Sequence, residues 1–280
     1  MLQNFLSENS LKLNTPQTAE HYQGAEGFPH IMIDNFLNAE TAEAALKNFP
    51  AVGDSTWINY LHYNEKKYGL NKREALPPTL LALIDKLNSP EFIAYLSEIT
   101  GIKNLIADPM LEGGGLHQIP PGGFLNLHAD FTAHPHHRFW RRRINLLIYL
   151  NKNWLEEYGG NLELWTRDMK RMFRKIPPLF NRCVIFNTDK DTFHGHPDPL
   201  KCPEDMTRKS IALYYFTEEE SLPLKKATNY QARPHEGMLK SVLILLDKKA
   251  LSVYNWLKGV LNIDDALVSK ILKFLSGGKK

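Results

Sequence analysis

The stretch Phe124-Leu125-Asn126-Leu127-His128-Ala129-Asp130 decides how this chain is interpreted. Apolar and polar residues alternate through it, which is typical of a β-strand with one buried face. Because side chains along a strand alternate between its two faces, His128 and Asp130 would point the same way. An imidazole and a carboxylate at this spacing can bind one metal ion together, and a third ligand must then come from another segment.

The third ligand is expected from the segment Thr192-Phe193-His194-Gly195-His196, in which His194 lies 64 residues after Asp130. His194 and His196 would share one face of a strand, so both are candidates. Two imidazoles and one carboxylate on one face of a metal leave the other positions open for substrate and oxygen. This is the arrangement found in non-heme iron(II) oxygenases.

Further strands are predicted after the metal-binding pair. Apolar or alternating runs separated by turn residues indicate them, and Gly159-Gly160 is one such turn. The predicted strands are Arg143–Leu150, Asn161–Trp165, Asn181–Phe186 and Arg208–Phe216, with the histidine-containing segment between the last two.

In this order the motifs resemble the Fe(II)/2-oxoglutarate-dependent oxygenases, in the prolyl 4-hydroxylase-like branch. The resemblance covers roughly Phe28 to Thr217 and rests on His128-Ala129-Asp130, Tyr149-Leu150-Asn151-Lys152-Asn153-Trp154, Gly159-Gly160 with Leu162 and Leu164, Phe186, His194, and Arg208 with Ser210. It implies an α+β fold around a double-stranded β-helix, a jelly roll of the cupin type, with the metal at one mouth of the barrel. N-terminal helices and a C-terminal helical extension are expected to flank this core.

The resemblance implies that His128, Asp130 and His194 are the iron ligands. In the family the third ligand precedes a small residue and a proline follows shortly after, which favours His194 over His196. His196 would then line the pocket or support a ligand. Prolyl hydroxylases often carry a tyrosine two residues before the first ligand, where this chain has Asn126, and the role of that position stays open.

The co-substrate residues also follow from the resemblance. Arg208 matches the basic residue that pairs with the distal carboxylate of 2-oxoglutarate, and a planar guanidinium suits this task because it can form two parallel hydrogen bonds. Tyr149 matches a tyrosine that donates its hydroxyl to the same carboxylate. Ser210 lies two residues beyond Arg208 on the same strand face and can add a further donor.

The activity that the resemblance implies is hydroxylation of an unactivated C–H bond. Fe(II), 2-oxoglutarate and O2 would be required, and 2-oxoglutarate would leave as succinate and CO2; a need for ascorbate is left open. A peptidyl proline is the first expectation for the substrate. A glycan, a lipid-linked sugar or a small metabolite is the alternative, so the partner is either a substrate protein or a small molecule.

Two other classes of protein stay open. A cupin-like zinc or nickel enzyme can use the same barrel, but it would not need Arg208 on the strand after the third ligand. A binding protein can keep the barrel after losing its chemistry. The complete set of His128, Asp130, His194 and Arg208 favours the oxygenase.

Composition is compatible with this interpretation. The chain has 280 residues and is 43% hydrophobic, so it can bury a full core, and residues 1–220 are expected to form one oxygenase domain. The two cysteines, Cys183 and Cys202, are too few for a disulfide framework or a Cys-based zinc site. No signal peptide or membrane-spanning run is recognisable, so a cytoplasmic location is expected.

Residues 221–280 differ in charge from the rest. They contain 11 Lys and Arg against 4 Asp and Glu, a net charge of +7. Two amphipathic helices are predicted, one over roughly Met238 to Leu261 and one capped by Asp264. We expect them to pack on the barrel or on a second copy in a homodimer, with peripheral membrane contact as the alternative. No nucleic acid is expected as a partner.

Several N-terminal features complete the expectations. Phe28–Leu37 is predicted to form a strand, Asn38 to cap a helix that ends near Phe49, and Ser89 to cap a helix that ends near Thr100. The aromatic stretch from Gly53 to Ala75 fits either the core or a substrate rim.

Two groups of residues are left with open roles. His117 can line the pocket or make a structural hydrogen bond. The cluster Arg138–Arg143 can hold an acidic substrate or form a charged loop with salt bridges, and the neighbouring His134, His136 and His137 are expected in a solvated loop.

Overall fold

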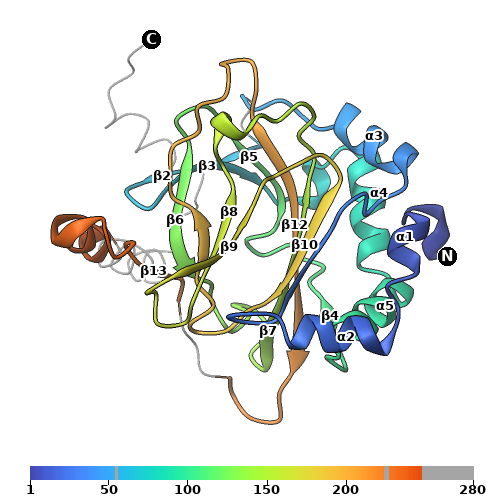
Figure 1. The fold of residues 1–280 in the computed structure, drawn as a ribbon. Coiled ribbons are helices and arrows are strands. Elements are labelled where there is room, and N and C mark those ends of the chain that lie inside the picture. Colours follow the sequence, from blue (N-terminus) through green and yellow to red (C-terminus); the bar gives the residue numbers. More distant parts are fainter. Residues whose placement is uncertain (54–55, 224–226, 248–280) are drawn as a thin grey trace.

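The computed structural model describes residues 1–53, 56–223 and 227–247 (Figure 1). The strands are β1 (His30–Ile33), β2 (Ile58–His62), β3 (Glu65–Leu70), β4 (Ile106–Ala107), β5 (Gly115–Ile119), β6 (Phe124–Ala129), β7 (Trp140–Tyr149), β8 (Leu162–Trp165), β9 (Met172–Ile176), β10 (Arg182–Asn187), β11 (His194–His196), β12 (Arg208–Glu218) and β13 (Asn229–Tyr230). The helices are α1 (Glu8–Leu11), α2 (Pro16–Gln23), α3 (Ala39–Lys47), α4 (Pro78–Leu87) and α5 (Pro90–Thr100), with short 3₁₀ turns at Leu2–Asn4, Arg73–Ala75 and Glu156–Tyr158.

Eight antiparallel strands form two groups that curl around a common interior. One group has the order β5-β12-β7-β10 and the other the order β6-β11-β8-β9, while β3 joins them by pairing with both β5 and β6. Apart from the β8–β9 hairpin, consecutive strands alternate between the groups. This is the topology of the predicted double-stranded β-helix.

The long strand β7 shows how the chain divides its side chains between two cores. Ile144, Leu146 and Ile148 belong to the larger hydrophobic cluster, which includes residues of the N-terminal helices. The residues between them face the barrel interior, where Asn145 and Leu147 line a cavity. Both faces of the strand are therefore covered from Ile144 onward, where Asn145 is the one polar residue before the strand ends at Tyr149.

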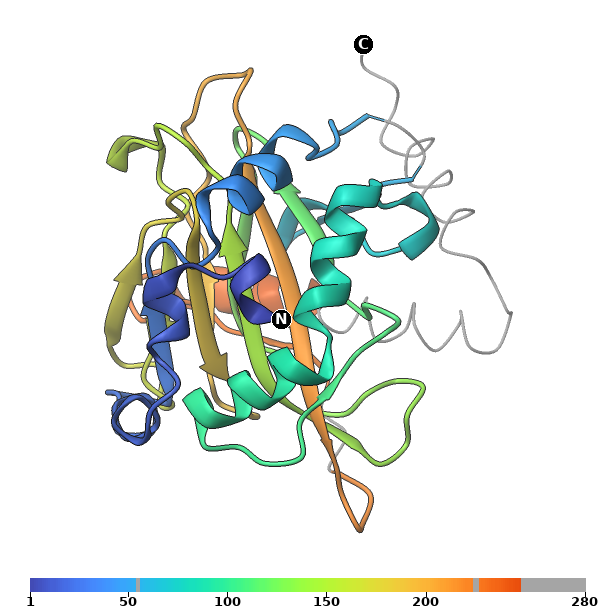
Figure 2. The same ribbon diagram turned by 90° about the vertical axis from the view of Figure 1, so that its right-hand side faces the viewer.

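The N-terminal helices cover one face of the group that contains β12 and β10 (Figure 2). Their ends agree with the predicted caps. The Asn38 side chain accepts a hydrogen bond from the Thr41 amide at the start of α3, and the Ser89 hydroxyl accepts one from the Phe92 amide at the start of α5. Helix α5 ends at Gly101, which adopts the left-handed conformation with φ +69°.

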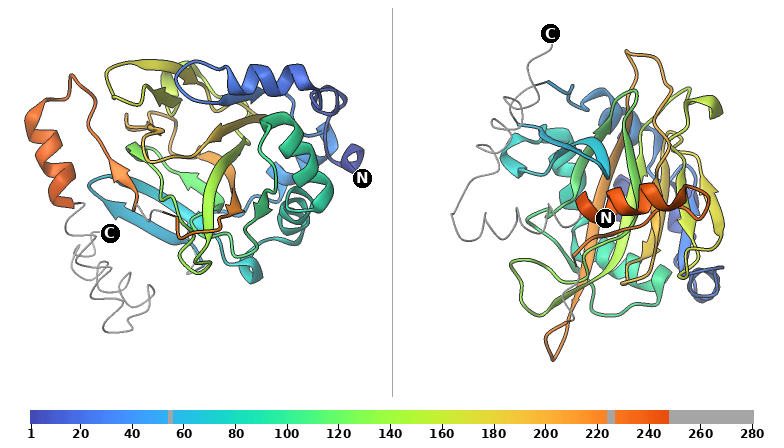
Figure 3. Two further views of the ribbon diagram at one scale, coloured as in Figure 1. Left: turned by 90° about the horizontal axis from the view of Figure 1, so that it is seen from below. Right: turned by 90° about the vertical axis from the view of Figure 1, so that its left-hand side faces the viewer.

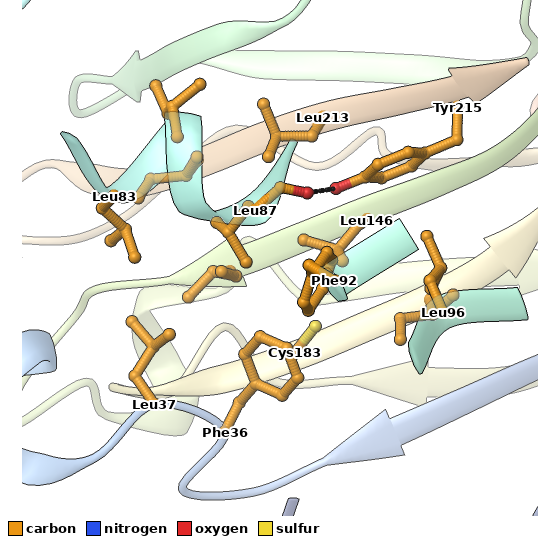
Figure 4. Packing of buried hydrophobic residues seen from close by; sticks show 14 of the residues in the cluster. Phe36, Leu37, Leu83, Leu87, Phe92, Leu96, Leu146, Cys183, Leu213 and Tyr215 are labelled. Atoms are coloured by element: carbon orange, nitrogen blue, oxygen red, sulfur yellow. Dashed lines mark hydrogen bonds between the residues drawn. The ribbon is translucent and has the colours of Figure 1, made fainter. Parts of the chain in front are cut away.

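Phe92 occupies the middle of the core between these helices and the sheet (Figure 4). Its side chain is fully buried and its ring centroid lies 6.3 Å from that of Phe36 and 6.4 Å from that of Tyr215. The Tyr215 hydroxyl donates a 2.9 Å hydrogen bond to the Leu87 carbonyl near the end of α4. Cys183 is a free thiol buried in the same core, so its role there is packing.

The aromatic stretch between residues 53 and 75 contains the hairpin β2–β3. Its side chains divide between the two expected roles. Trp57 is buried in the core and donates a 2.9 Å hydrogen bond to the Ala51 carbonyl, whereas Tyr60 lines the cavity inside the barrel. Tyr63 is 39% exposed at the tip.

The described residues 227–247 contact the barrel again. Strand β13 pairs with β6, and residues 237–247 are helical on the side of the barrel away from α4 and α5 (Figure 3). Asp247 accepts hydrogen bonds from the side chains of His62 and Asn64 in the β2–β3 hairpin. The predicted helix after Asp264 lies outside the described residues, and the boundary at residue 221 stays a prediction. None of the helices described here is long and apolar enough to cross a membrane.

We predict that Phe92→Ala lowers the free energy of unfolding by about 3–5 kcal/mol, because it removes a buried ring and leaves a cavity between helices and sheet. Chemical denaturation followed by circular dichroism measures this change. Leu61→Ala is the control, since that side chain is 55% exposed and its removal should change stability by at most about 0.5 kcal/mol. Equal losses for the two variants would contradict the assignment of the core.

Candidate active site

Pairing of β11 with β6 brings the three predicted metal ligands together. His194 lies directly opposite His128, and Asp130 follows the end of β6. The Nε2 atom of His128 lies 3.5 Å from Asp130 Oδ1, and that of His194 lies 3.4 Å from Oδ2. In the part of the chain that the structure describes, this is the one cluster of three such side chains, with ligand atoms within 4.8 Å of one another. His196 is not part of it.

Backbone carbonyls orient both imidazoles. His128 Nδ1 lies 2.9 Å from the Asn126 carbonyl, and His194 Nδ1 lies 3.2 Å from the Thr192 carbonyl. Each carbonyl accepts the Nδ1 proton, which leaves the Nε2 lone pair directed toward Asp130. Burial, with the neighbouring His128, lowers the pKa of His194 to about 3, so its ring is a neutral nitrogen donor at neutral pH.

Asp130 is held by two donors on one oxygen. Its Oδ2 atom accepts hydrogen bonds from Arg142 Nη2 at 3.0 Å and from Asn145 Nδ2 at 2.7 Å. Burial alone would raise the pKa of this carboxyl, but the neighbouring charge of Arg142 holds it well below its usual value. The carboxylate is therefore ionised, and the lone pairs of Oδ1 are left for a metal.

Arg142 belongs to the arginine cluster whose role the sequence leaves open, and it lies beside Asp130. Its side chain is only 1% exposed, and its guanidinium carbon lies 3.4 Å from the centre of the Tyr214 ring and 4.6 Å from that of Phe131. It also donates to the Asn145 side-chain oxygen from Nε and Nη2. This cation is fixed by stacking and hydrogen bonds before any ligand binds.

The other arginines of the cluster form ordinary surface contacts. Arg141 lies 3.8 Å from Asp189, and Arg143 lies 3.7 Å from Glu219. These partly exposed pairs agree with the charged-loop interpretation of the cluster. Only Arg142 points inward.

Arg208 lies on β12 at the other end of the same cavity. It is 4% exposed, donates from Nε to the Gly160 carbonyl at 2.8 Å, and donates from Nη2 to the Tyr149 hydroxyl at 3.3 Å. No carboxylate of the described residues forms an ion pair with it. A buried cation without an acidic partner is costly unless a ligand supplies the charge.

The Gly159-Gly160 turn makes this position of Arg208 possible. Gly160 has φ +69°, and a β-carbon there would lie 3.0 Å from the Arg208 Cδ atom and 2.6 Å from Leu200. Both the backbone conformation and the contact therefore require glycine. The Gly159-Gly160 turn, which is recognisable in the sequence, is thus in direct contact with Arg208.

A cavity of about 160 Å³ connects the two ends of the site. The predicted residues that line it are His128, Asp130, His194, Arg208, Ser210, His117 and His196. Tyr149 lies behind Arg208, where its buried hydroxyl accepts that residue's hydrogen bond. Tyr60 of the aromatic stretch and Arg142 of the arginine cluster also line the cavity. So do seven residues that were not predicted: Glu65, Lys67, Phe131, Asn145, Tyr214, Thr228 and Tyr230.

Asn126 has a structural role in place of the family's tyrosine. Its side-chain amide donates to the Tyr63 carbonyl at 3.3 Å and to the Asn64 side-chain oxygen at 3.2 Å. It therefore ties β6 to the β2–β3 hairpin, and it does not line the cavity.

One unpredicted residue carried a signal in the sequence. Asn145 is a polar residue inside the apolar run of β7, and a buried polar side chain needs a partner. Lys67 and Tyr230 had no comparable signal, because their places in the wall depend on strand pairing.

A comparison with known families agrees with this geometry. Residues 114–216 match the family model described as the 2OG-Fe(II) oxygenase superfamily. This part of the chain is therefore similar to that superfamily. The matched region contains the three clustered ligands and Arg208, and the superfamily uses Fe(II), 2-oxoglutarate and O2.

Curated relatives are similar over limited regions. The mouse prolyl 3-hydroxylase OGFOD1 is 25% identical over 194 residues, which cover 68% of this chain and 33% of that protein. The human prolyl hydroxylase EGLN3 is 30% identical over 99 residues, which cover 35% of this chain and 39% of that protein. The alignments thus span between a third and two fifths of the relatives' length.

Solved structures share the fold. A prolyl hydroxylase from Trichoplax adhaerens, in complex with a peptide fragment of the oxygen degradation domain of hypoxia inducible factor, has 21% identity and a TM-score of 0.53. That alignment covers 75% of this chain and 93% of the other. A Pseudomonas putida prolyl-4-hydroxylase has 14% identity and a TM-score of 0.51, with 74% and 99% coverage. The double-stranded β-helix of the prolyl hydroxylases is therefore the fold of this chain.

We predict that Asn145→Ala weakens metal binding about 10- to 100-fold, because Asp130 loses one of the two donors that orient it. Titration with Mn(II) measures the affinity without any need for turnover. Asn151→Ala is the matched control: that buried amide donates to the Pro178 carbonyl at 2.7 Å, so its loss should reduce stability but leave metal affinity unchanged. Equal metal affinities for Asn145→Ala and the unaltered protein would contradict the role given to Asn145.

Proposed function

We propose that the protein is an Fe(II)- and 2-oxoglutarate-dependent dioxygenase that hydroxylates an unactivated C–H bond. The observation that carries the proposal is one cavity with two unlike ends. The cluster of His128, Asp130 and His194 lies at one end, and the buried Arg208 lies at the other without an acidic partner among the described residues. A molecule that binds a metal at one end and presents a carboxylate at the other fits both.

The donor set suits iron(II). Two imidazole nitrogens and one carboxylate oxygen are the facial ligands of non-heme iron oxygenases, and they leave positions open for other ligands. We propose His128, Asp130 and His194 as the metal ligands. When bound, the iron would supply the activation of O2 that amino-acid side chains cannot perform.

Protein side chains would bind and orient the co-substrate. Arg208 would donate to the distal carboxylate of 2-oxoglutarate, and Ser210, which faces the same cavity, would add a hydroxyl. Tyr149 accepts from Arg208 and would hold its guanidinium in place. Apolar walls from Ile119 and Leu147 would exclude water around the carbon chain.

For the substrate we propose a peptidyl proline. The support is that the similar proteins named above are prolyl hydroxylases. The cavity also carries the aromatic rings of Tyr60, Phe131, Tyr214 and Tyr230, which can pack against an apolar ring. A glycan, a lipid-linked sugar or a small metabolite is the second candidate.

The decisive experiment measures conversion of 2-oxoglutarate to succinate by the iron-loaded protein, alone and with cell extract. Mass spectrometry of proteome and metabolites from cells with and without the active protein then identifies the substrate. An added mass of one oxygen on proline residues supports the peptidyl substrate. A cupin-like enzyme of another class or a binding protein would show no turnover of 2-oxoglutarate.

Location and assembly are proposed from composition. We propose a cytoplasmic protein, with the basic residues after Ser221 serving packing, a homodimer or contact with a membrane surface. Of the two predicted helices that bear on this choice, only residues 237–247 are described.

His128→Ala should abolish metal binding and turnover, and His194→Ala should do the same, because each removes one of three ligands. His196→Ala should retain the metal. Elemental analysis after loading with Fe(II) under nitrogen measures the metal content of all three variants. Loss of iron in His196→Ala together with retention in His194→Ala would mean that the third ligand was assigned to the wrong histidine.

Arg208→Ala should weaken 2-oxoglutarate binding by about 3–5 kcal/mol, because a buried carboxylate would be left without its partner. The metal should stay bound, since Arg208 touches none of the three ligands. Calorimetric titration of the Mn(II)-loaded protein separates the two effects. Arg143→Ala is the control at the surface, and an unchanged affinity in Arg208→Ala would show that another cation holds the carboxylate.

A further inference from the structure

His196 is the least satisfied polar side chain of the cavity. It is 3% exposed, and neither of its two ring nitrogens has a hydrogen-bond partner among the described residues. Native structures pair nearly all buried polar atoms, because an unpaired one loses its hydration without compensation. Two such atoms on one ring therefore call for a functional explanation.

Two cations share the cavity with this ring. His196 lines the same cavity as Arg208 and Lys67. Both side chains are donors only, so neither can accept the N–H of the imidazole. Lys67 already pairs with Glu65 at 2.9 Å, whereas Arg208 has no acidic partner among the described residues. His196 and Arg208 therefore lack a negatively charged hydrogen-bond acceptor among the described residues.

The position along β11 fits such an acceptor. His194 faces the cluster of metal ligands, and His196 follows two residues later, which is about 7 Å further along a strand. Both line the cavity despite the irregular pairing between them. A five-carbon dicarboxylate that reaches from the metal ligands toward Arg208 would pass beside His196.

We propose that His196 is a binding residue for the co-substrate and donates a hydrogen bond from its ring to the carboxylate that Arg208 holds. This inference rests on the proposed function. A neutral imidazole has one donor and one acceptor, so the second nitrogen would accept from a water molecule that enters with the ligand. The ring is thus unsatisfied in the empty cavity and satisfied in the filled one.

The first test is stability without metal or ligand. His196→Leu should raise the melting temperature by about 2–6 °C, because an apolar side chain removes two unpaired polar atoms from the interior. His30→Leu is the matched control, since His30 is also buried but has its Nδ1 paired with the Phe28 carbonyl at 2.9 Å. That variant should melt at a lower temperature than the unaltered protein. A lower melting temperature for His196→Leu would overturn the claim that its nitrogens are unsatisfied.

The second test is binding, measured by calorimetry on the Mn(II)-loaded protein. His196→Leu should bind 2-oxoglutarate about 10- to 100-fold more weakly, because it loses a hydrogen bond to a charged group. His196→Gln keeps a donor and should recover part of the affinity. Pyruvate has the 2-oxo acid but no distal carboxylate, so its affinity should be the same in the unaltered protein and in His196→Leu.

The outcomes separate this inference from the function on which it rests. If the unaltered protein does not bind 2-oxoglutarate, the proposed function itself fails. If the unaltered protein and His196→Leu bind it equally well, the function stands and the role of His196 is wrong. If His196→Leu weakens pyruvate as much as 2-oxoglutarate, the ring supports the metal centre rather than the distal carboxylate, which also overturns the inference.

Discussion

The register between β6 and β11 is the constraint on which the candidate site depends. It places His194 opposite His128, and a slip of one residue would turn His194 to the other face. Gly195 allows the close approach, because a β-carbon there would lie 2.8 Å from the Leu125 carbonyl oxygen and 2.9 Å from that of Asn126. Strand β11 has only three residues, so its pairing with β8 on the other side also helps to fix it.

The two buried charges of the cavity differ in their partners. Asp130 is paired with groups of the chain itself, whereas Arg208 has no acidic partner among the described residues. Asp130 would be costly to bury alone, but Arg142 and Asn145 provide a charge and hydrogen bonds that keep it ionised. Within the described part of the chain, Arg208 has only neutral partners, the Gly160 carbonyl and the Tyr149 hydroxyl. Asp130, which would bind the metal, is thus stabilised by the chain itself, and the positive charge of Arg208 is available to an anionic ligand. A dicarboxylate that chelates a metal requires this distribution of charge.

The sequence predicted those strands and helix ends that depend mainly on neighbouring residues in the chain. The strands β6, β7, β10 and β12 follow from alternation or apolar runs, and the helix starts follow from the caps Asn38 and Ser89. Features that depend on tertiary partners were missed. Arg142 resembled its exposed neighbours in the sequence, and β13 is only two residues long. His134 was expected in a solvated loop and is instead fully buried, with Nδ1 accepting from two backbone amides.

The cavity wall combines segments from inside and outside the region shared with the superfamily. The clustered ligands and Arg208 lie within residues 114–216, whereas Tyr60, Lys67 and Tyr230 do not. Tyr230 pairs opposite His128, with ring centroids 5.5 Å apart, and hydrogen bonds from Asp247 through His62 to Glu65 connect the residues after 227 to the hairpin. Likeness over residues 114–216 therefore bears on the metal and the co-substrate. The wall that a substrate would meet also includes Tyr60 and Lys67 of the β2–β3 hairpin and Tyr230 of β13, and these residues must be understood from this chain's own contacts.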